Sequence, residues 1–492
     1  MQKAKINFSV NTGLSPFLTD RKEMDSDQNL CLGIDLGTTS VKISIIDTAT
    51  KDQVFTTTEA TNAYISSNDG IQGAEQSILL IMDAICACIL RATDKTRSNI
   101  GCIAVSGQMH GVVLWNSEGK TPLSNTLDLA SFTSNLYTWE DRRATTQFLL
   151  SLPKPDSHQP ISAGFGNVTL FWLARNEPEL LVKYDTAGGV MDYLTTLLCG
   201  LDKPVMSNQI ACSWGYFNCQ TGTWNLNILK DNGFPVHLLP VTVAGGSKVG
   251  ELCADWFGIR RGTPVLSGLG DLQSSFMAAS KLPNDAVMNI STSSQIGFRI
   301  DCPGFSPPKQ DVPAPVSYFP YFDNGYLAVA ASLNGGNILK AFVRMLQQWV
   351  GTLGLTIHEE SIWLKLTEIA SYPEIAEEFS RPVIHPFLYG ERYNPNLTAS
   401  ISGMREENST LECIFHALCN GLVANLHQMM PLSLLIESGV ERVVLTGSVI
   451  SRQPHVMTCV KRTYSPLPVM LEIGAEASYG AALVAAKYLQ VP

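Results

Sequence analysis

The sequence predicts an α/β protein built from two lobes with a cleft between them. Three observations predict this class: the chain has 492 residues, 45% of them are hydrophobic, and one strand pattern occurs twice along it. A chain of this length exceeds what one hydrophobic core usually sustains, so we expect at least two domains. Ligands preferentially bind at domain junctions, so we expect the functional site in the cleft.

The first lobe opens with a β-hairpin. Residues 30–34 are apolar, a polar turn follows at 35–39, and apolar residues resume at 41–47. The elements predicted next are a strand near 53–59, a helix near 75–92 and a strand at 100–106. Three hairpin-linked strands therefore precede an alternation of helix and strand, unlike a classical Rossmann half.

The second lobe repeats this opening from about residue 283. A strand at 286–290 leads into a tip rich in serine and threonine, and a strand returns at 295–300. We also predict helices near 336–350, 410–438 and 475–489, and strands at 442–445 and 467–472. The predicted divisions are a flexible N-terminal extension at 1–28, an N-terminal domain at 29–279 and a C-terminal domain at 280–492.

Charge and hydropathy exclude several classes of partner. Lys and Arg total 34 against 44 Asp and Glu, and no basic run is present to neutralise a row of phosphates, so we expect no nucleic acid partner. No apolar run is long enough to span a membrane, so we expect no membrane partner. Residues 1–28 lack the apolar core of a signal peptide, which favours a cytoplasmic enzyme.

Cysteine and histidine spacing gives no metal signature. The twelve cysteines form no CxxC pair, and the eight histidines form no HxH or HExxH pattern. We therefore expect reduced, mostly buried thiols and predict no zinc site.

The turn from Asp35 to Ser40 (Asp-Leu-Gly-Thr-Thr-Ser) is the strongest single motif. Glycine lets the backbone approach phosphate oxygens, while successive amides and hydroxyls donate hydrogen bonds to them. The Asp35 carboxylate can hold Mg²⁺. Gly-Thr-Thr also occurs in plain hairpin turns, but the similar tip at 289–294 favours phosphate binding, because two tips across a cleft can clamp a triphosphate.

A glycine-rich turn at 267–271 supplies the candidate catalytic base. It follows the apolar strand at 263–266 and ends in Asp271, which places a carboxylate beside a flexible backbone. Phosphoryl transfer needs one carboxylate to accept the hydroxyl proton. A lone Gly-Asp is also typical of a turn or a helix cap.

Two further stretches have the composition of a sugar site. Gln108 to Gly111 ends a strand, and Trp139 to Arg143 combines an aromatic face with carboxylates and guanidinium groups that can bind vicinal hydroxyls. A lone histidine or tryptophan is more often structural. Near the end of the chain, Gly447 closes a strand before a helix, where its backbone can lie against adenine or ribose.

In this order, the motifs resemble those of the FGGY carbohydrate kinases. The resemblance spans residues 30–489 and rests on Asp35–Ser40, Gln108–Gly111, Trp139/Asp141/Arg143, Gly270-Asp271, Gly390–Arg392 and Gly447. It implies two actin-like (ribonuclease H-like) domains with ATP and Mg²⁺ in the cleft between them. The chain departs from the family pattern at Thr169, Ser291, Leu272 and Arg452.

The resemblance also implies roles for individual residues. Asp271 is the base and Asp35 serves the metal. The implied sugar contacts are Met109, His110, Trp139, Asp141 and Arg143. The implied contacts to ATP and its phosphates are Gly37, Thr38, Thr39, Ser40, Ser291, Thr292, Ser293, Gly336, Gly447 and Ser448.

Stretches at 213–218, 233–240 and 331–337 resemble the branch of the family that acts on a seven-carbon ketose. This implies ATP-dependent phosphorylation of sedoheptulose to sedoheptulose 7-phosphate, feeding the pentose phosphate pathway. The alternative is another ketose or polyol such as D-xylulose, because Met109-His110 also resembles xylulokinases. A non-catalytic nucleotide sensor would be expected to lack Asp271 or Asp35, and an actin-like chaperone ATPase has no need of the sugar stretches.

Overall fold

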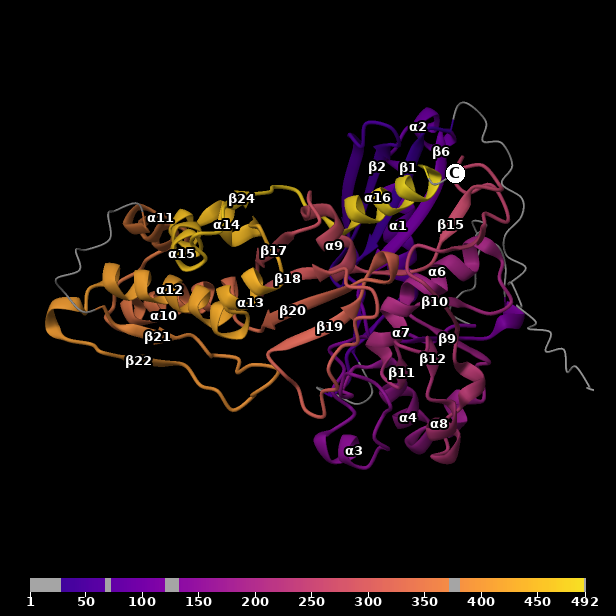
Figure 1. Ribbon diagram of the computed structural model, residues 1–492, viewed down its shortest axis with the longest axis horizontal. Coiled ribbons are helices and arrows are strands. Elements are labelled where there is room, and N and C mark those ends of the chain that lie inside the picture. The colour runs from indigo at the N-terminus through magenta and orange to yellow at the C-terminus, as the bar shows by residue number, and fades with distance from the viewer. Residues whose placement is uncertain (1–27, 67–71, 120–131, 371–380, 491–492) are drawn as a thin grey trace, which may run out of the picture.

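The computed structural model describes residues 28–66, 72–119, 132–370 and 381–490, so the predicted extension at 1–28 lies almost entirely outside the described residues. The described chain forms two regions, each built on one large β-sheet (Figure 1). The smaller paired strands are β4 (Tyr64–Ile65), β5 (Glu75–Gln76), β7 (Val113–Trp115), β8 (Leu136–Tyr137), β9 (Thr186–Gly188), β10 (Val205–Ser207), β11 (Phe217–Asn218), β12 (Thr223–Trp224), β13 (Val241–Val243), β21 (Val383–His385) and β22 (Ser400–Ser402).

The first sheet has the strand order β14-β15-β6-β1-β2-β3, with β16 beside β6. Its strands are β1 (Leu30–Leu36), β2 (Ser40–Asp47), β3 (Gln53–Ala60), β6 (Ile100–Gly107), β14 (Lys248–Glu251), β15 (Pro264–Leu266) and β16 (Leu269–Gly270). β1, β2 and β3 are antiparallel neighbours, and β6 lies parallel to β1. The predicted hairpin and the strands that follow it are therefore confirmed.

The second sheet repeats this arrangement. Its order is β19-β20-β18-β17-β23-β24. Its strands are β17 (Asp285–Ile290), β18 (Ser294–Ile300), β19 (Val316–Pro320), β20 (Tyr326–Ser332), β23 (Arg442–Thr446) and β24 (Val469–Leu471). β17, β18 and β20 are antiparallel, and β23 lies parallel to β17 as β6 lies parallel to β1. The two hairpin tips therefore occupy equivalent places in the two sheets.

Both regions also contain helices. In the first region they are α1 (Ile78–Leu90), α2 (Asp94–Ser98), α3 (Thr146–Leu150), α4 (Gly166–Asn176), α5 (Pro178–Leu181), α6 (Val190–Cys199), α7 (Asn208–Trp214), α8 (Leu226–Asp231) and α9 (Asp271–Ala279). In the second they are α10 (Gly336–Thr352), α11 (Glu359–Ala370), α12 (Leu411–Met429), α13 (Leu432–Glu437), α14 (Ser448–Arg452) and α15 (Pro454–Thr463), followed by α16 (Ala477–Gln490). The single long helix predicted near 410–438 is wrong, because Pro431 lacks the N–H that would continue it and two helices form.

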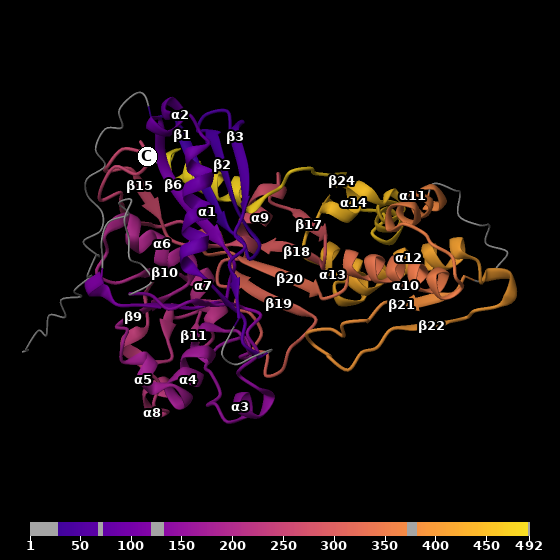
Figure 2. The same ribbon diagram turned by 180° about the vertical axis from the view of Figure 1, so that it is seen from behind.

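Alternation along β1 explains how the site is positioned. Leu32 and Ile34 point into the core shared with α1, whereas Cys31 packs on the opposite face with α16. Figures 1 and 2 show α16 and α1 on opposite faces of this sheet. Gly33 makes the close approach possible, because a Cβ there would lie 1.9 Å from the carbonyl oxygen of Ser478. Asp35, two residues on, lies on the α16 side.

Two helices join the regions. α9 and α16 pack against each other, and a buried cluster around them joins residues of both sheets, such as Ala104 of β6 and Val287 of β17, with Ala482 of α16. α16 therefore packs on the first sheet, although it is the last described element of the chain. The division of the chain at residues 279 and 280 stays a prediction.

Candidate active site

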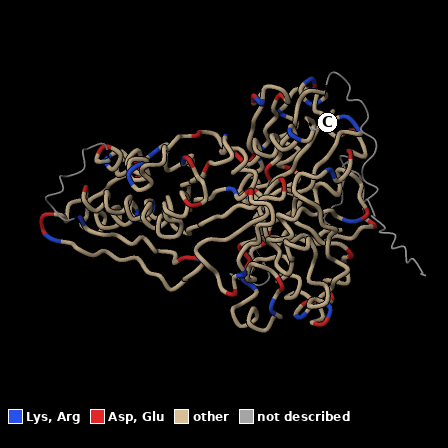
Figure 3. Tube along the Cα trace, viewed as in Figure 1, with Lys and Arg blue, Asp and Glu red and all other residues tan. Residues whose placement is uncertain are grey.

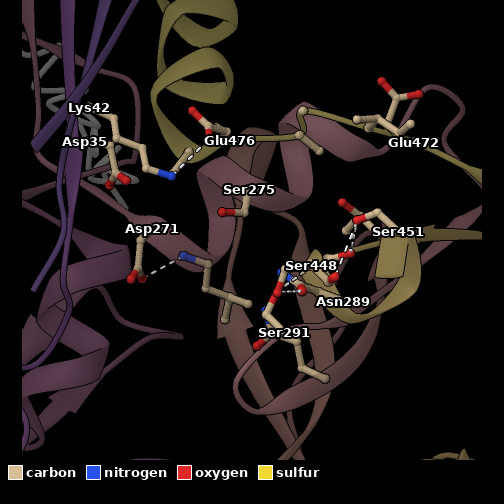
Figure 4. Close-up of a pocket in the computed structure, with 18 of the residues that line it drawn as sticks. Asp35, Lys42, Asp271, Ser275, Asn289, Ser291, Ser448, Ser451, Glu472 and Glu476 are labelled. Atoms are coloured by element: carbon tan, nitrogen blue, oxygen red, sulfur yellow. Dashed lines mark hydrogen bonds and ion pairs between the residues drawn. The ribbon is translucent and has the colours of Figure 1, made fainter. Parts of the chain in front are cut away.

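A cavity of about 570 Å³ lies between the two regions. Figure 4 shows Asp35 and Asp271 on one side of it and Asn289, Ser291 and Ser448 on the other. The residues that line it are Asp35, Lys42, Asp271, Leu272, Ser275, Asn289, Ser291, Gln295, Thr446, Gly447, Ser448, Ser451, Leu471, Glu472, Ile473, Gly474, Ala475, Glu476 and Ala477. Leu272, where the chain departs from the family pattern, is among them.

Two carboxylates open into this cavity. Asp35 comes from the end of β1, and Asp271 is the first residue of α9. Burial raises the pKa of Asp271 to about 6. The Leu272 backbone N–H, which donates to Oδ1 at 2.8 Å, lowers this pKa and so opposes part of the effect. Burial and then the charge of Asp271 raise the pKa of Asp35 to about 7. An Asp271 carboxylate with this pKa is mostly ionised at neutral pH yet basic enough to accept a proton.

Lys42 is the cavity cation that sequence reasoning missed. It lies on β2, and its Nζ is 3.0 Å from Oε1 of Glu476, which comes just before α16. Alternate residues of this otherwise apolar strand are polar, and Ser44 Oγ lies 2.8 Å from Ser478 Oγ. That alternation was the available signal, since it marks the strand face that meets α16.

The second hairpin tip borders the cavity through Ser291. Its hydroxyl donates to Asn289 Oδ1 at 2.9 Å and accepts from the Ser448 backbone N–H at 3.3 Å. Gly447 has φ 110°, and a Cβ there would lie 2.3 Å from the Ile290 carbonyl oxygen, so only glycine fits. Gly336 starts α10 and donates from its backbone to the Ser291 carbonyl oxygen at 2.7 Å. Thr292 and Ser293 are exposed at the tip and do not line the cavity.

The first tip has a different environment. Gly37, Thr38, Thr39 and Ser40 are not among the cavity residues. The Thr38 hydroxyl instead accepts from Trp139 Nε1 at 3.1 Å, and the Thr38 carbonyl accepts from Gln76 Nε2 at 2.6 Å. The predicted phosphate tip and the predicted sugar stretch are therefore joined by a direct hydrogen bond.

Met109 and His110 lie at the same edge of the first sheet as Asp271. β16 ends at Gly270 beside the end of β6, and a Cβ on Gly270 would lie 2.8 Å from Met109 Sδ. His110 has φ 73°, stacks on Phe165 with ring centres 4.6 Å apart, and holds Nδ1 2.8 Å from the Ser213 carbonyl oxygen. Burial lowers the pKa of His110 to about 4, so its ring is neutral at physiological pH.

Asp141 and Arg143 are held inside the protein. The Arg143 Nε lies 2.9 Å from Asp141 Oδ1, and an Arg143 terminal nitrogen lies 2.7 Å from Glu75 Oε1. Both side chains are at most 2% exposed, and the Arg143 guanidinium stacks over Tyr137. Their polar groups are therefore engaged with protein partners.

Asp35 fits a role as metal ligand. Its Oδ1 is buried without a well-formed hydrogen bond, and burial together with the charge of Asp271 raises its pKa. An unpaired buried oxygen of this kind is costly, and a hard divalent cation compensates for it.

Lysines and arginines are interspersed with acidic residues along both regions (Figure 3). No described helix is both long and apolar enough to cross a membrane.

Solved sugar kinases share this fold. Xylulose kinase from Rhodospirillum rubrum matches with a TM-score of 0.76 at 18% identity, covering 94% of this chain and 91% of that chain. Plasmodium falciparum glycerol kinase with ADP matches with a TM-score of 0.72 at 17% identity, covering 94% and 90%. The protein therefore has the two-domain, actin-like α/β fold of these kinases.

Sequence comparison then gives the family. The model of the FGGY family of carbohydrate kinases, N-terminal domain, matches residues 30–278. Human sedoheptulokinase is 41% identical over 472 residues, which cover 92% of this chain and 97% of the human protein, and mouse sedoheptulokinase is 41% identical over 464 residues, covering 92% and 96%. The chain belongs to the FGGY family of carbohydrate kinases, whose phosphoryl donor is ATP.

Proposed function

We propose that this chain is a sedoheptulokinase, which transfers the γ-phosphoryl group of ATP to the terminal hydroxyl of sedoheptulose. The observation that carries the proposal is the 41% identity to human sedoheptulokinase over nearly the whole of both chains. The product is sedoheptulose 7-phosphate.

Asp271 is the general base in this proposal. It lies at the start of a helix, on the cavity wall, and no lysine, arginine or histidine among the described residues forms an ion pair with it. Its carboxylate accepts the proton of the attacking hydroxyl as the phosphoryl group moves. Met109 lies beside Gly270 and so borders the same place as the base.

The nucleotide occupies the side of the cavity formed by the second region. Gly447 and Ser448 face the nucleoside, and Ser291 with the exposed Thr292 and Ser293 faces the phosphates. Asp35 would hold the Mg²⁺ that accompanies ATP, and that ion, when bound, neutralises phosphate charge. Lys42, paired with Glu476, adds a cation beside Asp35.

The sugar occupies the side formed by the first region. Met109, His110 and Trp139 are the proposed contacts. Asp141 and Arg143 support this wall from behind, because their polar groups already bind each other and Glu75. The hydrogen bond from Trp139 to Thr38 ties the sugar wall to the first hairpin tip.

A substrate panel tests the proposal. Coupled ATP turnover is measured with sedoheptulose, D-xylulose, D-ribulose and glycerol, and sedoheptulose is expected to give the highest kcat/KM. An unpaired buried polar group costs about 1 to 3 kcal/mol, so a ketose that lacks one recognised hydroxyl is expected to lose roughly 5- to 150-fold. A higher kcat/KM with D-xylulose would replace sedoheptulose by the alternative substrate and leave the kinase assignment intact.

A further inference from the structure

A second group of chemically reactive side chains lies in the first region, among residues to which the proposed reaction gives no role. The metal-ligating atoms of His158, Cys212 and Cys219 all lie within 4.8 Å of one another. Cys212 belongs to α7, Cys219 directly follows β11, and His158 lies in the segment between α3 and α4. Over the described ranges, no other three histidine, cysteine or acidic side chains bring their ligand atoms this close.

The orientation of His158 is fixed by the second region. Its Nε2 lies 2.8 Å from the backbone carbonyl oxygen of Tyr318 on β19. A carbonyl oxygen only accepts, so Nε2 carries the proton and donates it. Nδ1 is left as the nitrogen available to the two cysteines. Histidines that bind metals are typically held in this way, with the second ring nitrogen donating to a carbonyl or carboxylate.

The two cysteines supply the remaining ligand atoms. Cys212 is 4% exposed, and Cys219 is partly buried, so one side of the group remains open to solvent. Thiolate and imidazole are the ligands that zinc prefers.

We propose that His158, Cys212 and Cys219 form a zinc-binding site, with a solvent molecule as the fourth ligand. In tetrahedral zinc sites the metal–sulfur distance is about 2.3 Å and the metal–nitrogen distance about 2.0 Å, so ligand atoms that all lie within 4.8 Å need only small shifts to bind one ion. Binding forms two zinc–sulfur bonds and one bond from zinc to the unprotonated Nδ1, and the protons of the two thiols go to solvent. No electron is transferred.

A metal at this site would link parts of the chain that are distant in sequence. A metal bound there links α7 to the segment that carries His158, and the His158–Tyr318 hydrogen bond extends the link to the second sheet. Ser213, next to Cys212, holds both the backbone N–H and Nδ1 of His110. Zinc is therefore expected to stabilise the packing of α7 in the first region, whichever sugar the protein phosphorylates.

Cobalt binding tests the proposal on the full-length protein, reduced and stripped of metal. Co²⁺ is titrated while thiolate-to-cobalt charge transfer and tetrahedral d–d absorption are followed, and Zn²⁺ is then added to displace it. We expect one Co²⁺ per chain in the wild type, and loss of the charge-transfer band in Cys212→Ser and Cys219→Ser. Cys199→Ser is the matched control, because Cys199 lies near Cys253 in a group without histidine, and it is expected to keep the band.

A second variant covers the case in which a cysteine variant fails to fold. His158→Gln keeps both thiols, and we expect it to bind Co²⁺ at least tenfold more weakly than the wild type. Zn²⁺ is expected to raise the Tm of the wild type and of Cys199→Ser, but not that of Cys219→Ser, because a ligand that binds only the folded state stabilises it. The proposal is overturned if the reduced wild type gives no charge-transfer band, if Cys219→Ser binds Co²⁺ as the wild type does, or if peroxide forms a Cys212–Cys219 disulfide in a protein that binds no Co²⁺.

Discussion

The two hairpin tips share one backbone design but differ in chemistry. β1 brings Asp35 to the cavity, whereas β17, at the equivalent place in the second sheet, brings the neutral Asn289. In the proposed function, Asp35 and Asp271 of the first region are the anionic side chains for metal binding and catalysis, while the second tip offers neutral hydroxyl and amide groups. Carboxylates repel phosphates, whereas hydroxyl and amide donors bind them. The difference therefore favours phosphate binding at the second tip and proton or metal binding at the first.

The tips also differ in how their polar groups are used. Thr38 in the first tip is bonded to Trp139 and Gln76, whereas Ser291 in the second lies on the cavity wall. In the proposed function, the same hairpin therefore supports the sugar wall in one region and contacts the nucleotide in the other.

The largest expected effect comes from removing the proposed base, Asp271, from the first region. Asp271→Asn keeps the size of the side chain but cannot accept the hydroxyl proton, so we expect kcat to fall about 10²- to 10⁴-fold while sugar affinity changes little. The measurement is kcat of the purified variant beside calorimetric sugar binding.

The control for this prediction is Asp94→Asn. Asp94 is likewise the first residue of a helix, α2, but it lies outside the cavity. It is expected to keep full activity. If Asp271 only caps its helix, both variants will behave alike, because Asn caps about as well as Asp, and a fall in kcat below tenfold will remove Asp271 from the mechanism.

A smaller effect is expected at the carboxylate of the first tip. Asp35→Asn removes an anionic oxygen from the proposed metal site, so we expect turnover to fall about 10- to 100-fold and the Mg²⁺ concentration for half-maximal activity to rise. The measurement is turnover over a range of Mg²⁺ at saturating ATP. An unchanged Mg²⁺ dependence will show that Asp35 does not serve the metal.

Adding a carboxylate to the second tip tests whether its neutral side chains are needed for phosphate binding. Asn289→Asp gives this tip the carboxylate that the first has, and repulsion of the phosphates is expected to raise KM for ATP about tenfold, which corresponds to about 1.4 kcal/mol. KM for the sugar is expected to stay within twofold of the wild-type value. The control is Asn232→Asp, an exposed position at the end of α8, where KM for ATP is also expected to stay within twofold. A normal KM for ATP in Asn289→Asp will place the phosphates away from this tip.

A paired comparison separates the two tips further. Thr38→Val keeps the shape of the side chain but leaves the Trp139 N–H without its acceptor, which costs about 1 to 3 kcal/mol where the group is buried. We expect KM for the sugar to rise severalfold and KM for ATP to be unchanged, with the reverse for Ser291→Ala. A rise in KM for ATP with Thr38→Val will instead make the first tip a phosphate contact.

The fold was largely predictable because its signals are local. Apolar runs broken by polar turns define β1, β2, β17 and β18 to within a few residues. The split of α12 from α13 depended on Pro431, whose effect on a helix is also local, and the prediction overlooked it. The return of α16 to the first sheet depends on packing of Gly33 against Ser478, and nothing near either residue in the sequence indicates that contact.

The site was predictable only in part, for the same reason. Asp35, Asp271, Ser291, Gly447 and Ser448 line the cavity, and each lies in a recognisable turn. Lys42 and Glu476 are 434 residues apart, and their pairing appears only once the chain is folded. The group of His158, Cys212 and Cys219 likewise comes from separate segments, so spacing predicted no zinc site there. Binding of Mg²⁺, a cytoplasmic location and a role in the pentose phosphate pathway stay predictions.

The smallest expected effect concerns stability and follows from the buried Asp35 carboxylate of the first region. The folded-state pKa of Asp35 is raised to about 7, so the native protein binds more protons than the unfolded chain between about pH 4 and pH 7. The free energy of unfolding of the metal-free protein therefore falls as pH rises through this range. Asp35→Asn removes the titrating group, so the variant is expected to gain stability over the wild type from pH 5 to pH 8, by on the order of 1 kcal/mol. Urea unfolding of both proteins at the two pH values measures this gain, and Asn289→Asp is expected to show the opposite trend by placing a new carboxylate at the cavity. If the difference in the free energy of unfolding between Asp35→Asn and the wild type is the same at pH 5 and pH 8, the pKa of Asp35 is not raised in the folded protein.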